Sequence, residues 1–268
     1  MDATITDQEF ALFQRLIYRL AGINLSTAKK VLLVGRLSRR LTHHGFGTFT
    51  EYYRLLASGN DADELQTFVD LLTTNETYFF REPQHFDFLR DVIIPARRAS
   101  HPFRIWSGAC SSGEEPYTMA MVLAEHLPHT PWEVFASDIS QTVLARAQAG
   151  VYPLERTSGI PHEYLRKYCM KGVRSQEGRL LVAPELRQRV RFAQVNLTAP
   201  IVGAGDFDVI FLRNVMIYFD ADTKRKVVEN MIPSLKPGGY FIVGHSESLN
   251  GITDRLKSLR PTVYQKAI

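Results

Sequence analysis

The feature that most constrains the fold is a regular alternation of short apolar runs and helical patterns from about residue 101 onward. Apolar runs of this length, bounded by turn residues, are typical of buried strands. Strands that alternate with helices are typical of a parallel sheet covered by helices. We therefore predict an α/β sheet with the strands FRIWSG, WEVFASD, DFDVIFLRN and YFIVGH and the helices EEPYTMAMVLAEHL, SQTVLARAQAG and ADTKRKVVENMIPSLK.

The first seventy or so residues have a purely helical pattern instead. Two apolar stripes follow helical spacing: Phe10, Phe13, Ile17 and Leu20, then Leu33, Val34, Leu37 and Leu41. Shorter helical patterns follow around 48–57 and 61–72. We predict an all-helical N-terminal domain at 1–74 and an α/β domain at 75–268.

This helical part carries an unbalanced positive charge. Eight Lys or Arg residues lie between positions 15 and 54, against the single acid Glu51. Lys29, Arg36 and Arg40 are spaced to stack along one helix face, and Arg39 lies beside them. Such a surface suits an acidic partner, either nucleic acid or a negatively charged protein. The alternative is an ordinary solvated helix face.

Composition excludes several classes of protein. A hydrophobic content of 45% with 22% charged residues is ordinary for a folded chain. No apolar run is long enough to cross a bilayer, and the acidic start MDATITDQEF lacks the pattern of a signal peptide. Two cysteines cannot form a disulfide framework, and no Cys/His spacing indicates a zinc site. We expect a cytoplasmic protein without a metal.

The segment YCMKGVRSQEGRLLVAPELRQRVRFAQ interrupts the alternation of strands and helices. Gly172 and Gly178 bracket a polar loop between two strand-like runs. We predict a small antiparallel β-hairpin, inserted at about 163–192 at the edge of the main sheet.

The turn after the first predicted strand, in IWSGACSSGEEP, is rich in small residues that let a backbone approach a ligand. A helix that begins there would hold a phosphate in a dinucleotide fold. Glu114 and Glu115 occupy that place here and would repel phosphate. They suit a cationic ligand, or one that offers amine and hydroxyl donors; a purely structural turn is the alternative.

A second acid ends the next predicted strand. Asp138 lies 25 residues beyond Gly113. An acid at this place can accept hydrogen bonds from two ribose hydroxyls. The alternative role is an N-cap for the following helix, but the glycine-rich turn favours the ribose.

The sequence LKPGGYFIVG completes a set that resembles the class I S-adenosylmethionine-dependent methyltransferases. In that superfamily a helix, a Pro-Gly-Gly turn and a strand lead into the last part of the sheet. Its cofactor has no phosphate and carries a cationic amine, which agrees with acids at the start of the helix.

A narrower set of motifs resembles the CheR family of chemotaxis receptor methyltransferases over nearly the whole chain. The motifs are TNETYFFR (74–81), SGEEPY (112–117), ASD (136–138), VNL (195–197) and RNVMIYF (213–219). The family implies a Rossmann-like methyltransferase domain with an inserted antiparallel β-subdomain, preceded by a small all-α domain. It also implies esterification of glutamate side chains on the cytoplasmic helices of chemoreceptors, with S-adenosylhomocysteine as the second product.

The resemblance also implies residue roles. Arg81 and Tyr218 would orient the reacting groups, with Arg81 near the methionine end of the cofactor and Tyr218 near the transferable methyl. At least two of Tyr78, Phe79 and Phe80 are expected only to pack the linker against the sheet. The expected cofactor contacts are Asn75, Thr77, Arg81, Glu115, Asp138, Asn196, Leu197, Arg213 and Asn214.

The same resemblance implies functions for the line of basic residues in the N-terminal part, here called the basic ridge, and for the predicted hairpin. Lys29, Arg36, Arg39 and Arg40 could dock the acidic helices of a receptor by charge. The hairpin could add a receptor C-terminal peptide as an extra strand, or serve structure alone. We expect a monomer at membrane receptor arrays, held there by protein contacts.

Three other functions compete with this one. A DNA methyltransferase would share the fold, but RNVMIYF lacks the proline pair that such enzymes carry after the fourth strand. A small-molecule O-methyltransferase would not need the basic ridge. A non-catalytic adaptor would not need to keep Asn75, Arg81, Asp138 and Tyr218. Receptor methylation is the leading hypothesis.

Overall fold

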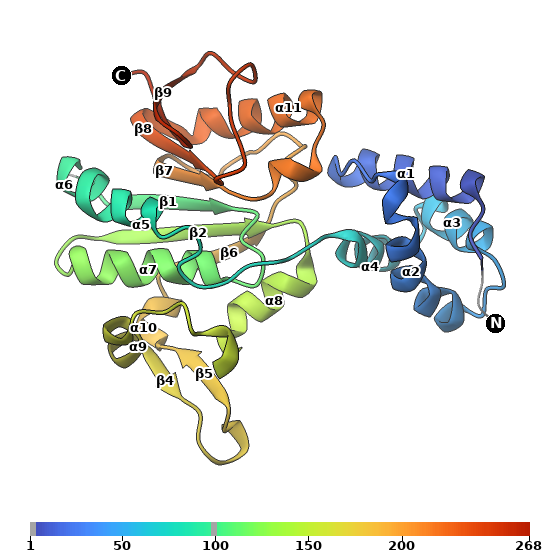
Figure 1. The fold of residues 1–268 in the computed structure, drawn as a ribbon, viewed down its shortest axis with the longest axis horizontal. Coiled ribbons are helices and arrows are strands. Elements are labelled where there is room, and N and C mark those ends of the chain that lie inside the picture. Colours follow the sequence, from blue (N-terminus) through green and yellow to red (C-terminus); the bar gives the residue numbers. More distant parts are fainter. Residues whose placement is uncertain (1–3, 98–100) are drawn as a thin grey trace.

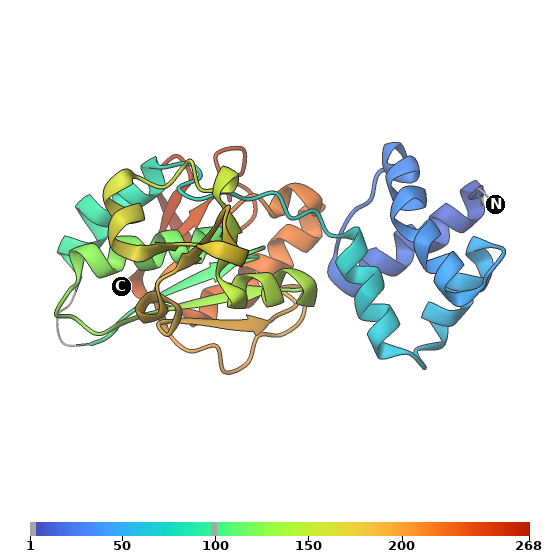
Figure 2. The same cartoon turned by 90° about the horizontal axis from the view of Figure 1, so that it is seen from below.

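A computed structural model describes residues 4–97 and 101–268. Figures 1 and 2 show a helical N-terminal domain beside a larger α/β domain, joined by an extended linker that leaves the end of α4. Among the described residues, no helix has the length and apolar character needed to span a membrane.

The N-terminal domain consists of four helices and one short 3-10 turn. Two of the helices begin with a capping box, in which Thr6 pairs with Glu9 and Thr48 pairs with Glu51. Phe13 and Phe68 are fully buried between the helices. The elements are α1 (Asp7–Ala21), η1 (Thr27–Lys29), α2 (Lys30–His44), α3 (Phe49–Ser58) and α4 (Ala62–Leu72). The predicted all-α fold of this part is confirmed.

One buried carboxylate ties three of these helices together. Glu64 of α4 accepts hydrogen bonds from Arg40 of α2 and from Tyr52 of α3, the latter at 2.6 Å. His44 lies 3.2 Å from the same carboxylate. Burial alone would raise the pKa of Glu64, but these hydrogen bonds outweigh it and lower the pKa below its ordinary value. Glu64 therefore stays ionised in the domain core.

The α/β domain is built on one seven-stranded sheet with the order β6-β2-β1-β7-β8-β10-β9. The first five strands of that order run parallel, and β10 is antiparallel to both of its neighbours. The strands are β1 (Phe103–Gly108), β2 (Trp132–Asp138), β6 (Val190–Gln194), β7 (Phe207–Leu212), β8 (Leu235–Val243), β9 (Leu256–Arg260) and β10 (Val263–Lys266). This confirms the predicted Rossmann-like class.

Helices cover both faces of this sheet (Figure 1). The core on one face holds Tyr117 of α7, and the core on the other holds Trp106 together with Val228 of α11. The sequence analysis did not predict the helical segment after the linker. The helices are α5 (Gln84–Phe88), a π turn (Leu89–Ile93), α6 (Ile94–Ala96), α7 (Glu114–His126), α8 (Gln141–Ala149) and α11 (Ala221–Met231).

The predicted hairpin is present but belongs to a larger unit. β4 (Cys169–Lys171) and β5 (Arg179–Val182) form the hairpin, and β3 (Val151–Pro153) adds to the other edge of β5. The insertion therefore begins before residue 163, and β6 at its predicted end pairs with β2 in the main sheet. It also holds α9 (His162–Tyr168), α10 (Pro184–Arg187), η3 (Leu154–Arg156) and η4 (Arg174–Gln176).

The Pro-Gly-Gly sequence is not a separate turn before the strand. It lies within β8, which begins at Leu235 directly after η6 (Ile232–Ser234). The register with β7 shifts there, and Gly238 has φ +75°, which a glycine adopts readily. The motif therefore marks an irregularity in the strand.

Candidate active site

A cavity of about 380 Å³ lies between the two domains, at the carboxyl ends of β1, β2 and β7. Ligands of open α/β sheets bind at this edge. Ala21, Asn24 and Lys29 of the N-terminal domain line one side, and linker residues between 72 and 81 line another. A ligand in this cavity would contact both domains and the linker.

The turn after β1 brings only one of its two acids to the cavity. Glu115 lines it and accepts a hydrogen bond from Ser107 at 2.7 Å. Glu114 is fully buried and pairs with Ser112 and Arg156 instead. Of the two acids, only Glu115 is therefore placed to face a ligand in this cavity.

Arg213 joins the sheet to the linker. Its buried guanidinium lies 3.1 Å from Glu115 and 3.0 Å from Glu82, and it donates to the carbonyl of Arg81. Burial raises the pKa of Glu115, and Arg213 partly opposes that rise. For Glu82 the pull of Arg213 and other donors exceeds the effect of burial, so its pKa is lowered. Two carboxylates thus share one guanidinium.

Asp138 lies at the end of β2 and lines the cavity. One carboxylate oxygen accepts the N–H of Ser111 at 2.9 Å, and the other accepts the N–H of Ser140 at 2.9 Å. The N-cap of α8 is Ser140, whose side chain accepts from Val143. Burial raises the pKa of Asp138 against the effect of these hydrogen bonds. Asp138 thus holds the loop after β1 and the loop before α8 in place, and it also faces the cavity.

The linker presents polar residues to the cavity, while two of its three aromatic residues pack inward. Asn75, Thr77 and Arg81 line the cavity, and the Arg81 guanidinium also donates to the carbonyl of Glu76 at 2.8 Å. Phe79 is buried edge-on against Tyr152, while Phe80 stacks on Tyr164. Tyr78 is half exposed at the cavity. Packing by two of the three aromatics is therefore confirmed.

The remaining predicted cofactor contacts and Tyr218 also line the cavity. Leu197 is buried at the cavity, and Tyr218 lines it from η5 (Met216–Tyr218). The Asn196 amide group donates to the Leu20 carbonyl at 2.7 Å, which ties the sheet to α1. The Asn214 amide donates to Glu82 at 3.1 Å. All nine predicted cofactor contacts lie around this one cavity.

Sequence reasoning missed several residues that build the site. Glu247 accepts three backbone N–H groups, from Asn214, Met216 and Gly244, and thereby holds the loop after β7. Glu82 has the same holding role in the linker. Asn24 donates its backbone N–H to the Tyr218 carbonyl at 2.8 Å. Glu82 and Glu247 lie in loops whose sequences show neither helical nor strand periodicity, so only the three-dimensional contacts identify them.

The predicted basic ridge divides into two parts. Arg36 donates to the carbonyls of Leu71 and Thr73, both at 2.9 Å. Arg40 is paired with Glu64. The prediction of four free cations on one face is therefore wrong for Arg36 and Arg40. Their guanidinium groups hold α4 and the start of the linker. Lys29 and Arg39 remain exposed.

Together, the sheet order and the acid at the end of β2, facing a cavity at the carboxyl ends of the strands, are those of a class I S-adenosylmethionine-dependent methyltransferase. Family models agree with this assignment. The CheR methyltransferase SAM-binding domain matches residues 75–265, and the CheR methyltransferase all-alpha domain matches residues 8–73. The chain belongs to the CheR methyltransferase family.

Curated relatives extend this likeness over nearly the full length. A chemotaxis protein methyltransferase of Escherichia coli is 43% identical over 97% of this chain and 91% of its own. Chemotaxis protein methyltransferase 2 of Pseudomonas aeruginosa is 42% identical over 98% and 94%. A third, from Borreliella burgdorferi, is 38% identical over 99% and 96%.

The residues around the cavity fit S-adenosylmethionine. The buried Asp138 carboxylate offers acceptors for ribose hydroxyls, and the linker with Glu115 offers acceptors for a cationic amine. Leu197 and Ile139 supply apolar surface for a ring. When bound, the cofactor supplies the methyl group, while this chain's residues bind and orient it.

Proposed function

We propose that this protein transfers the methyl group of S-adenosylmethionine to glutamate side chains of chemoreceptors. The products are glutamate methyl esters and S-adenosylhomocysteine, and the reaction serves receptor adaptation in bacterial chemotaxis. The named chemotaxis methyltransferases that this chain resembles support the choice of substrate. The structural observation that carries it is the cofactor cleft, one wall of which is an N-terminal domain with exposed basic residues.

The composition of the cavity agrees with a carboxylate as the methyl acceptor. A glutamate is already ionised at neutral pH and needs no general base. No histidine is found among the described residues that line the cavity. Both reacting charges disappear as the methyl moves, so alignment and exclusion of water are what the protein must provide. Alignment alone can contribute about 7–11 kcal/mol.

Arg81 and Tyr218 are the residues we assign to orient the acceptor. Both line the cavity, one from the linker and one from η5. Neither has to exchange a proton in this reaction. The Arg81 guanidinium also lies 5.6 Å from the centre of the Tyr78 ring, which limits its freedom to move.

Competing acceptors receive less support from the site. The loop after β7 carries Arg213 and Asn214, both engaged with Glu82, where a base-flipping enzyme would stack its target. An adaptor that had lost catalysis would have no use for a cavity of this size lined by Asn75, Arg81 and Asp138. A small-molecule acceptor would make no use of the exposed cations of the N-terminal domain.

The reaction can be tested with S-adenosylmethionine labelled on its methyl group and membranes that contain chemoreceptors. We expect label on the receptor band, released as methanol by mild alkali because carboxyl methyl esters are alkali-labile. Receptors whose methylated glutamates are changed to alanine serve as the control and should take up no label. Label that survives alkali would indicate nitrogen or ether chemistry and would contradict the proposal.

Replacement of Tyr218 by Phe should lower kcat about tenfold to a hundredfold, while the Kd for the cofactor changes little. The reason is that the hydroxyl would act on the acceptor, so its loss misaligns the transfer. Stopped-flow turnover and calorimetric cofactor binding would measure the two effects. Tyr53→Phe, in the N-terminal domain core, is the matched control. A large loss of cofactor affinity in Tyr218→Phe, or unchanged turnover, would remove Tyr218 from this role.

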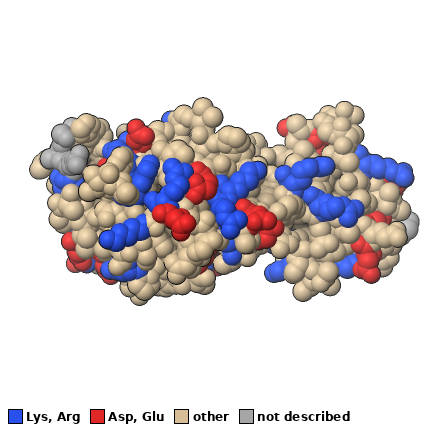
Figure 3. All heavy atoms as spheres, turned by 90° about the horizontal axis from the view of Figure 1, so that it is seen from above, with Lys and Arg blue, Asp and Glu red and all other residues tan. Residues whose placement is uncertain are grey.

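We further propose that exposed cations of the N-terminal domain dock the acidic helices of the receptor. Lys29 stands at the rim of the cavity and Arg39 is exposed on α2. Figure 3 shows that Lys and Arg side chains are spread over the N-terminal domain on the face seen there. Charge complementarity of this kind acts mainly on association, and salt screens it.

The variant Lys29→Glu/Arg39→Glu should therefore raise the receptor KM several-fold at low salt, with less effect at high salt. The Kd for S-adenosylmethionine should stay the same. Lys226→Glu/Lys257→Glu changes the net charge equally at exposed positions of the other domain, outside the small antiparallel sheet, and is the control. An unchanged KM would leave Lys29 and Arg39 as ordinary solvated residues. Arg36 and Arg40 are unsuitable for this test because they hold the fold.

The small antiparallel sheet offers a site for a receptor peptide. β4 is an edge strand in the order β3-β5-β4, so its outer backbone groups have no strand partner in that sheet. We propose that an extended C-terminal peptide of the receptor adds to this edge. The enzyme would then act as a cytoplasmic monomer, held at receptor arrays by protein contacts.

A further inference from the structure

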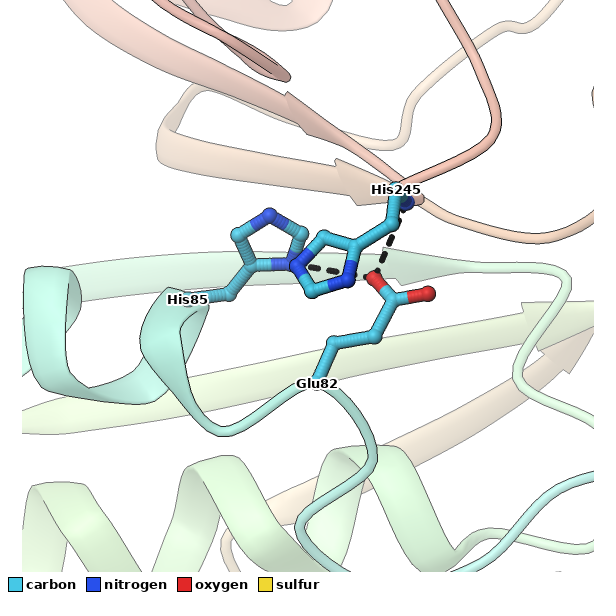
Figure 4. A group of neighbouring side chains, drawn as sticks. All are labelled: Glu82, His85 and His245. Atoms are coloured by element: carbon cyan, nitrogen blue, oxygen red, sulfur yellow. Dashed lines mark hydrogen bonds and ion pairs between the residues drawn. The ribbon is translucent and has the colours of Figure 1, made fainter.

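Three side chains outside the cofactor cavity converge behind the linker. Glu82 and His85 come from the linker and the start of α5, and His245 follows the end of β8 (Figure 4). One ligand atom of each residue lies within 4.8 Å of the others. His245 is far in sequence from Glu82 and His85, so no spacing of Cys and His could reveal the group.

The contacts of Thr262 favour one tautomer of the His85 ring. Its Nε2 lies 2.8 Å from the Thr262 hydroxyl, which itself donates to the Pro261 carbonyl at 2.6 Å. With the Thr262 hydrogen directed to that carbonyl, its oxygen is free to accept the Nε2–H of the His85 ring. In the neutral ring, Nδ1 is then a bare acceptor.

That acceptor is buried and has no hydrogen-bond partner among the described residues. It faces Glu82 Oε2 at 3.4 Å, so two electron-rich atoms oppose each other. A buried, unpartnered ring nitrogen beside a carboxylate oxygen is an arrangement that a bound cation would complete.

The surroundings can accept positive charge. Arg213 is shared between Glu82 and Glu115, so two carboxylates face one guanidinium. Glu82 Oε2 also accepts the His245 backbone N–H at 3.2 Å, which keeps His245 close. The two imidazole rings lie 5.1 Å apart, and His245 is exposed, so its ring can rotate inward and an ion can enter.

We propose that Glu82, His85 and His245 form a binding site for a divalent transition-metal ion, with zinc as the best match. Two imidazole nitrogens and one carboxylate oxygen form a ligand set that zinc uses, with water in the fourth position. The Thr262 hydroxyl would orient His85 as an outer-shell partner. Magnesium would bind poorly, because it prefers oxygen ligands throughout.

An ion at this site would compete with Arg213 for Glu82. Arg213 also holds Glu115 and the Arg81 carbonyl at the cofactor cavity. Occupancy should therefore weaken S-adenosylmethionine binding, and metal and cofactor would oppose each other. This coupling rests on the proposed function, whereas metal binding itself does not.

The site can be tested on the full, tag-free chain after treatment with a chelator. Calorimetric titration with Zn²⁺ should show one saturable site per chain, and Mg²⁺ should show none. His245→Ala should weaken Zn²⁺ binding by at least about tenfold, since even outer-shell partners contribute tenfold to a hundredfold. His129→Ala, which removes an exposed histidine elsewhere, should bind as the unaltered chain does. Cobalt absorption would report the coordination directly.

His245 is the position of choice because it is exposed, whereas changes at Glu82 or His85 could disturb the fold. Circular dichroism would check that His245→Ala is folded. Absence of a one-to-one site, or a His245→Ala variant that binds Zn²⁺ as tightly as the unaltered chain, would overturn the proposal. Zinc should raise the Kd for S-adenosylmethionine only in the unaltered chain. Unchanged cofactor affinity with zinc bound would overturn the coupling.

Discussion

The buried Arg213 guanidinium is the contact on which the site depends. It lies between Glu115 of the sheet domain and Glu82 of the linker, and it also binds the Arg81 carbonyl. Loss of one partner of a buried ion pair costs about 3–5 kcal/mol, because the other charge is left unpaired in the interior. The linker is therefore fixed against the carboxyl end of β7, with Asn75, Thr77 and Arg81 at the cavity.

The same constraint explains why the N-terminal domain belongs to the site. Arg36 holds the end of α4 and the start of the linker through the carbonyls of Leu71 and Thr73. Asn196 binds the Leu20 carbonyl, and Asn24 binds the Tyr218 carbonyl. These contacts close the cavity with a second domain, so residues of both domains and of the linker surround the place where the cofactor would bind.

Much of this could be predicted from the sequence, because the strands that end at the cavity are continuous apolar runs. FRIWSG and WEVFASD coincide with β1 and β2, and Asp138 ends its strand as expected. Short elements with weak patterns were missed, namely β3, the segment from α5 to α6, and the last two strands, β9 and β10. The roles of Arg36, Arg40, Glu82 and Glu247 depend on partners distant in sequence. Helical spacing predicts which face of a helix a cation occupies. It does not show whether a backbone carbonyl of another segment lies close enough to accept a hydrogen bond from that cation.

The central claim is that one cofactor cleft is shared by the sheet, the linker and the N-terminal domain. Hydrogen exchange with and without S-adenosylhomocysteine tests it most directly. The account predicts slower exchange at residues 21–26 and 73–81 as well as at 109–115, with no change in α3 far from the cavity. Slower exchange confined to the sheet domain, with residues 21–26 and 73–81 unaffected, would contradict it.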